Sequence, residues 1–164
     1  LQTMAEMLKN RDMEKYYLCI VKGKLNKPQK VSAYLRKDEK TNKVTVSKQE
    51  IFGGNHIETA YEPVISNDEF TLLKVKLITG KTHQIRAHLA SIGHPLIGDF
   101  KYGDRKINQQ MKQRFGLKDQ LLHCQEIVFP KHMKTCSNLS GKRIQAPLPK
   151  RFETIKQELF GRDL

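Results

Sequence analysis

The most constraining feature of the sequence is residues 72–92, where a hydrophobic pattern of period two changes to one of period 3.6 across a Gly-Lys-Thr turn. The first part predicts a strand with one covered face, because apolar side chains alternate with lysines: Leu73, Val75 and Leu77 against Lys74 and Lys76. The second part predicts a helix of about three turns, since Ile85, Leu89 and Ile92 recur at i, i+4 and i+7. Thr82 is the expected N-cap and Gly93 the stop. The sequence therefore predicts a strand-to-helix junction.

Arg86 lies on this predicted helix beside its apolar face. At about 100° per residue, His83 and Ala90 share its side. A guanidinium is always charged and is costly to remove from water unpaired, so we expect a planar acceptor, either a carboxylate or a phosphate. The spacing leaves open a purely structural role, in which Arg86 ties the helix to a nearby residue of a sheet.

The rest of the chain predicts an α+β fold with a mixed, mainly antiparallel sheet and flanking helices. Short apolar runs bounded by turn residues indicate the strands 16–21, 31–35, 44–46, 57–64, 72–78 and 125–129. The run 16–21 is apolar on both faces, which is typical of an inner strand. Helices are expected at 105–115, ended by Gly116, and at 149–160. With 164 residues and no linker or repeat, the chain is of the size of one domain.

The charge of the chain favours a polyanionic partner. Thirty Lys and Arg against seventeen Asp and Glu give a net charge of +13, and phosphate contacts with counterion release are the usual use of such an excess. Two basic clusters, in 101–114 and 131–151, are candidates for contact with an RNA backbone, although such runs also occur as solvated faces. The sequence shows no apolar run of membrane-spanning length and no signal peptide, so we expect a cytoplasmic protein with no membrane partner. It indicates no obligate protein partner.

Metal and nucleotide sites are not indicated. The three cysteines form no C-x-x-C pair, and His83 and His88 lie about 140° apart on the predicted helix, which is unsuited to a shared metal. A phosphate-binding loop ending in Gly80-Lys81 would need glycine at Val75. An enzyme using this turn for phosphate is therefore a weaker alternative, while Lys81 remains a candidate contact to an RNA phosphate.

Several segments together resemble the RluA-type family of RNA pseudouridine synthases. They are TGKTHQIRAH at 79–88, GHPLIGD at 93–99, Tyr102-Gly103, RDMEKYYLCIVKG at 11–23, LHC at 122–124, Phe129-Pro130 and APLP at 146–149. The resemblance covers nearly the whole chain and is nearest to the C/D-type members.

The resemblance implies an enzyme that converts specific uridines of structured RNA to pseudouridine without cofactor or metal. The family acts on both ribosomal and transfer RNA, and the likeness to the C/D-type members favours ribosomal large-subunit RNA. It assigns catalytic roles to Tyr17, against the target base, and to Arg86, paired with the catalytic aspartate, and RNA contacts to Lys81, His83 and Gln84. On the residues alone, Tyr17 could be a core tyrosine, and His83 and Gln84 could simply cap the helix.

The family's nucleophilic aspartate, in a His-Arg-Leu-Asp segment, does not occur in this sequence. The first residues already read as a helical face without a cap, so we expect residues 1–164 to be the C-terminal part of a catalytic domain. The chain alone is then expected to be inactive, with Arg86 under-satisfied or holding a substitute anion. The rival hypothesis is a non-catalytic RNA-binding module.

Overall fold

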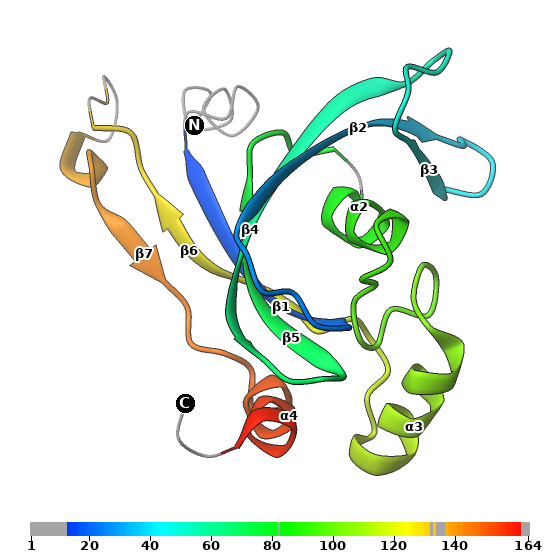
Figure 1. Cartoon of the computed structure of the whole chain (residues 1–164). Helices are drawn as coiled ribbons and strands as arrows, with labels where there is room; N and C mark the ends of the chain where they lie inside the picture. Colours follow the sequence, from blue (N-terminus) through cyan, green and yellow to red (C-terminus); the bar gives the residue numbers. More distant parts are fainter. Residues whose placement is uncertain (1–12, 82, 132, 134–136, 162–164) are drawn as a thin grey trace.

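The fold is a seven-stranded sheet with helices on both faces. A computed structural model describes residues 13–81, 83–131, 133 and 137–161. The strands lie in the order β3-β2-β4-β5-β1-β6-β7, and every pair is antiparallel (Figure 1). Their bounds are β1 Glu14–Lys22, β2 Gln29–Lys37, β3 Val44–Ser47, β4 Asn55–Ser66, β5 Phe70–Leu77, β6 Leu122–Val128 and β7 Arg143–Gln145. The predicted α+β class is confirmed, with a sheet that is wholly antiparallel in the described residues.

Three helices cover the sheet: α2 Gln84–Ser91, α3 Arg105–Phe115 and α4 Lys150–Phe160. On one face α2 packs against β1 and β5, where Ile85 and Leu89 join Cys19, Leu73 and Val75 in one buried cluster. The inner position predicted for the strand at 16–21 is confirmed, because β1 lies between β5 and β6.

The opposite face of the sheet is covered by α4. Phe152 and Ile155 of this helix pack with Leu18, Ile20 and Leu72. The N-terminal half of β5 is therefore buried on both faces, whereas the sequence pattern predicted only one covered face. Lys74 and Lys76, further along β5, lie beyond this cover and are partly exposed.

The predicted junction is present, with a shorter helix. Helix α2 has 8 residues, about two turns, because His83 adopts a left-handed conformation (φ 55°) before it and Ile92 is its C-cap. The predicted N-cap Thr82 and the predicted helical face in 1–12 lie outside the described residues. No helix in the described part of the chain is long and apolar enough to cross a membrane.

Candidate active site

The five residues singled out from the sequence line one pocket. Tyr17 comes from β1, Lys81 from the turn after β5, and His83, Gln84 and Arg86 from the start of α2. Leu77, Ile85 and Leu122 supply apolar walls. The pocket has a volume of about 240 Å³, equal to that of about eight water molecules at about 30 Å³ each, which is room for one pyrimidine base.

Arg86 is held by a carboxylate of the same chain. Its Nε donates to Oδ2 of Asp99 at 2.8 Å and its Nη2 donates to Oδ1 at 3.0 Å. The Asp99 side chain is 0% exposed and that of Arg86 is 16% exposed, so this is a largely buried, bidentate pair. The expectation that Arg86 would be under-satisfied or hold a substitute anion is wrong for Nε and Nη2, because Asp99 supplies the planar acceptor that a guanidinium requires.

The loop that carries Asp99 also donates hydrogen bonds to its carboxylate. The backbone N–H groups of Lys101 and Tyr102 both donate to its Oδ1 at 3.0 Å. Burial alone would raise the pKa of Asp99, but the hydrogen bonds from Arg86 and from these amides outweigh it and hold the pKa below its usual value. The Asp99 carboxylate is therefore ionised at neutral pH.

Asn108 anchors the same loop from α3. Its Nδ2 donates to the carbonyl oxygen of Asp99 at 2.8 Å, and its Oδ1 accepts from the backbone N–H of Gly98 at 2.7 Å. Asn108 therefore ties the loop that carries Asp99 to α3. The sequence did not single out Asn108, which is buried on a helix otherwise read as a basic surface.

One nitrogen of the Arg86 guanidinium is left over. Within the described residues Nη1 donates no hydrogen bond, while Nε and Nη2 are both held by Asp99. The ring of Tyr102 lies 5.2 Å from Cζ, a distance at which a cation interacts favourably with an aromatic face. Arg86 therefore lines the pocket with a guanidinium group whose plane is fixed on one side by Asp99.

Tyr17 lies on the pocket side of β1, and its neighbour Tyr16 lies on the other. Tyr17 is opposite Cys124 of β6, at a register shift that follows Tyr16. Bulges of this kind re-aim side chains. Burial, followed by the neighbouring Cys124, raises the pKa of the Tyr17 phenol, so it is protonated at neutral pH.

Tyr16 belongs to a different surface. Its ring lies 4.9 Å from Nζ of Lys74 and 5.9 Å from that of Lys76, and its hydroxyl donates to Glu14 at 2.8 Å. A larger hollow of about 420 Å³ lies beside it on this face of the sheet. Of the two adjacent tyrosines, Tyr17 is the one that lines the pocket of Arg86, while Tyr16 lines the larger hollow.

The Gln84 side chain makes hydrogen bonds within the junction between β5 and α2. Its side chain is 2% exposed, and its Oε1 accepts from the Thr79 hydroxyl at 2.8 Å and from the Lys81 N–H at 3.0 Å. Its Nε2 donates to the carbonyl oxygen of Glu58 at 2.9 Å and to the Thr59 hydroxyl at 3.0 Å. With both ends of the amide used in this way, Gln84 ties the turn before α2 to β4, and the contact with RNA stays a prediction.

Thr59 extends this buried network to a histidine that the sequence left without a role. Its hydroxyl oxygen accepts from Gln84 and also lies 2.8 Å from Nδ1 of His88, within hydrogen-bond distance. His88 is buried, which lowers its pKa and keeps it neutral. No local pattern indicated the contact, since the two residues come from β4 and α2.

His83 and Lys81 are the more accessible residues of the pocket. Nδ1 of His83 lies 2.9 Å from the Tyr102 hydroxyl, which also accepts from the backbone N–H of Val44. Burial and the positive charges of Arg86 and Lys101 lower the pKa of His83, so it is neutral at pH 7. Lys81 is exposed. Both side chains are placed where a substrate in the pocket can meet them.

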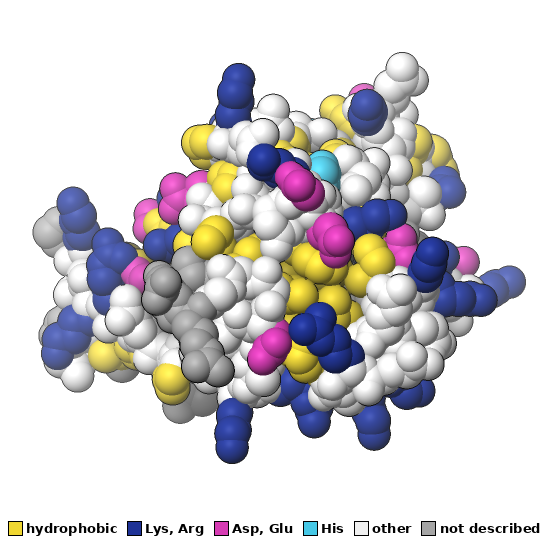
Figure 2. Space-filling view, turned by 60° about the horizontal axis from the view of Figure 1, so that its bottom comes forward, with side chains coloured by type: hydrophobic (Ala, Val, Ile, Leu, Met, Phe, Trp, Pro, Cys, Tyr) yellow, Lys and Arg dark blue, Asp and Glu magenta, His cyan; other side chains and the backbone are white. Residues whose placement is uncertain are grey.

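The two predicted basic clusters lie on separate elements. The first is on α3 and the loop before it, and the second is around β7 and the start of α4, with Lys134 outside the described residues. In the view of Figure 2, Lys and Arg side chains project around much of the outline of the molecule. Contact of the two clusters with an RNA backbone stays a prediction.

The geometry defines a class of protein before any comparison: a basic α+β domain with a base-sized pocket, a fixed arginine and a half-buried phenol. Residues 1–91 match the family described as RNA pseudouridylate synthase. The chain belongs to this family.

Two curated relatives from bacteria are similar to this chain over nearly its whole length. The chain is 37% identical over 159 residues to ribosomal large subunit pseudouridine synthase C of Pasteurella multocida, which covers 94% of this chain and 46% of the relative. It is 35% identical over 163 residues to the protein of the same name from Haemophilus influenzae, covering 97% of this chain and 48% of the relative. The chain thus spans about half the length of the curated relatives it matches.

A solved structure supports the fold. Human RNA pseudouridylate synthase domain containing 4 superposes with a TM-score of 0.74 at 19% identity, covering 96% of this chain and 66% of the human chain. This similarity confirms the predicted architecture; at 19% identity it supports the fold alone.

Proposed function

We propose that the protein to which this chain belongs converts uridines of structured RNA to pseudouridine, and that residues 1–164 form the C-terminal part of its catalytic domain. The observation that carries the proposal is the convergence of Tyr17 and Arg86 on one pocket of the size of a base. The names of the relatives favour ribosomal large-subunit RNA as the substrate.

Arg86 is proposed to hold the nucleophilic carboxylate. Asp99 occupies Nε and Nη2, so Nη1 is the nitrogen from which a hydrogen bond to a second carboxylate would come. An opposite charge at this range lowers the pKa of an aspartate and keeps it ionised. The aspartate would come from the family's His-Arg-Leu-Asp segment, which is not in this sequence.

The reaction then follows the family's course. The uridine is flipped out of its stack into the pocket, the aspartate attacks, and the N-glycosidic bond breaks. The uracil turns, and its C5 bonds to C1′ of the ribose as the bond between C1′ and the aspartate breaks. C5 then loses its proton, and N1 gains one. Tyr17 would lie against the base as a neutral phenol, since its pKa is raised, while Lys81 and His83 would contact the RNA.

Tritium release from RNA labelled at C5 of uridine tests this proposal in the complete protein. Arg86→Ala should lower turnover by about 100-fold or more, the size expected when a fixed charge is removed from a reaction centre, while RNA affinity stays nearly unchanged. Lys27→Ala, which removes an exposed charge between β1 and β2 outside both basic clusters, serves as the control and should retain turnover.

Two results would contradict the assigned roles. A fall in RNA affinity that matches the fall in turnover would make Arg86 a binding residue only. Tritium release by residues 1–164 alone would show that no further carboxylate is needed.

A further inference from the structure

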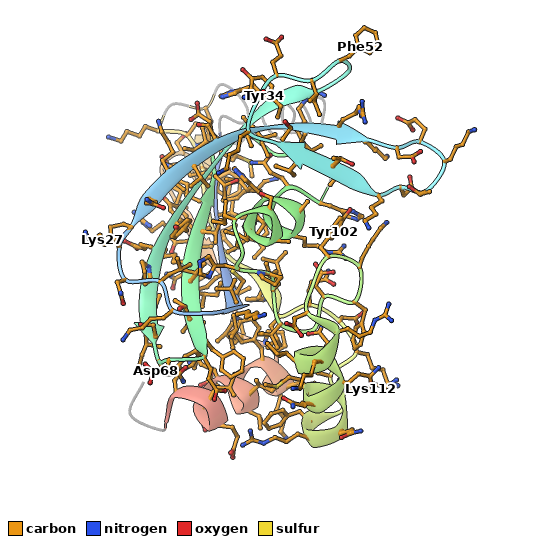
Figure 3. The ribbon with its side chains drawn as sticks, turned by 45° about the vertical axis from the view of Figure 1, so that its right-hand side comes forward. Lys27, Tyr34, Phe52, Asp68, Tyr102 and Lys112 are labelled. Atoms are coloured by element: carbon orange, nitrogen blue, oxygen red, sulfur yellow. The ribbon has the colours of Figure 1, made fainter. Side chains whose placement is uncertain are left out.

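The loop between β3 and β4 carries an almost fully exposed phenylalanine. Phe52 is 96% exposed, and Figure 3 shows its ring projecting away from the ribbon at the same end of the molecule as Tyr34. Arg36 of β2 contacts this loop. Its Nη1 makes a long hydrogen bond of 3.5 Å to the Phe52 carbonyl oxygen, and its Cδ lies 3.6 Å from the position a Cβ would take on Gly53.

Two more aromatic rings lie on the same ribbon. Tyr34 of β2 is directly opposite His56 of β4, and their rings meet edge to face with centroids 5.4 Å apart. Tyr34 and Arg36 share one face of β2, because side chains two apart in a strand point the same way. The intervening Leu35 is buried in the cluster that includes Ala87 of α2, so this aromatic face is turned away from α2.

The surroundings of these rings are cationic. Residues 29–54 carry six Lys or Arg and three Asp or Glu, within a chain of net charge +13. Exposed aromatic rings bordered by cations are the usual platform for unpaired nucleobases, because every base offers a flat face and every nucleotide a phosphate. A purely apolar protein contact would not explain this excess of positive charge.

We propose that Tyr34, Arg36, Phe52 and His56 form a stacking site for an unpaired nucleotide of the RNA. This rests on the proposed function only in taking RNA as the substrate. His56 and Thr59 are three residues apart in β4, so their side chains lie on opposite faces of the sheet. Thr59 faces α2, where Gln84 donates to its hydroxyl, and α2 carries Gln84 and Arg86 of the pocket. The stacking site therefore lies on the other face of the sheet and would hold a nucleotide apart from the flipped uridine.

The test uses two RNA probes with this chain. One is a hairpin with 2-aminopurine in its single-stranded loop, whose fluorescence is quenched by stacking, and the other is a fully paired duplex of equal length. Phe52→Ala should weaken binding of the hairpin about tenfold, consistent with loss of one base–aromatic stack, and should remove the quenching, with duplex binding unchanged. Phe52→Trp should preserve both signals.

Val64→Ala is the control. Like Phe52, Val64 is an exposed apolar residue (52% exposed), but it lies in β4 and is not one of the four residues of the proposed site. It should change neither probe. The proposal is overturned if Phe52→Ala binds the hairpin as tightly as the wild type, or if hairpin and duplex affinities fall by the same factor. It is equally overturned if the variant changes only self-association in light scattering, which would make Phe52 a protein contact.

The complete protein separates this inference from the proposed function. Phe52→Ala there should raise KM for RNA while leaving kcat nearly unchanged. If tritium is released normally but Phe52 has no effect on binding, the stacking site fails alone. If Phe52-dependent quenching is seen and no pseudouridine forms, the proposed activity fails alone.

Discussion

Replacing Asp99 by asparagine tests whether the buried pair with Arg86 fixes this part of the fold. Asparagine keeps the size of the side chain and one oxygen, which can still accept from Nη2 and from the backbone amides that now contact Oδ1. Its NH₂ group, however, would lie where Oδ2 accepts from Nε. The charge is lost and two donors face each other.

The expected cost follows from the geometry. Breaking a buried ion pair by removing one partner costs about 3–5 kcal/mol. Because the Arg86 side chain is 16% exposed and one acceptor survives, we expect the lower end, about 3 kcal/mol. For a chain of this size that corresponds to a fall in Tm of about 6–12 °C.

Urea denaturation followed by circular dichroism measures the change, with Asp68→Asn as the control. The Asp68 side chain is 98% exposed and lies 3.9 Å from Lys24, so its replacement should cost less than about 0.5 kcal/mol. If Asp99→Asn destabilises the chain no more than this control does, the pair does not carry the role assigned to it.

The pH dependence gives a second check on Asp99. Its pKa is lower in the folded chain than in the unfolded chain, so its contribution to stability is present above the usual value of 3.8 and is lost as the pH falls through the folded value. The difference between wild type and Asp99→Asn should therefore be constant from pH 7 to about pH 5 and shrink at more acid pH. A difference that does not change with pH would show that lost packing, and not the ionised carboxylate, causes the effect.

Three further predictions concern the frame around the pocket. Gly98→Ala should destabilise the chain by about 3 kcal/mol or more, because a Cβ there would collide with the carbonyl oxygen of Asp119, whereas Gly93→Ala, at a similar positive φ with open space around it, should cost only about 1–2 kcal/mol in thermal unfolding. Thr59→Val removes the hydroxyl that pairs with Nδ1 of His88 and accepts from Gln84 and should cost about 1–3 kcal/mol in urea denaturation; a change under about 0.5 kcal/mol would refute the network. Because burial lowers the pKa of His88, the folded chain binds fewer protons than the unfolded one, so stability should decline as the pH drops below 6.5; flat stability between pH 7 and 5 would contradict this.

The local patterns predicted the elements well and their partners poorly. The junction of β5 with α2 and the hairpin of β2 with β3 follow from periodicity and turn residues, which act over a few positions. The partner of Arg86 does not, because Asp99 lies 13 residues away in a loop whose path is set by Asn108 on a later helix. The predicted need for a planar acceptor was correct, while its source could not be found from spacing.

Burial patterns failed where distant segments return to the sheet. Leu72 and Phe70 lie on the face of β5 that the alternation left open, yet both are buried because α4 packs there. The end of α2 was misjudged for a local reason. Ile92 fits the helical period but adopts φ −97° and ψ 11° as the C-cap, since the chain turns at Gly93.

The fixed pairing of Arg86 bears directly on how the proposed site would work. An arginine without a partner would lose side-chain freedom when a carboxylate bound, and that loss would oppose binding. Here Asp99 already holds two nitrogens, and Lys101 and Tyr102 already hold Asp99. A second carboxylate would therefore meet a guanidinium whose position is set in advance, while Asp99 partly cancels its charge. The structure thus favours orientation over raw attraction as the contribution of Arg86, which is what a residue that aims a nucleophile requires.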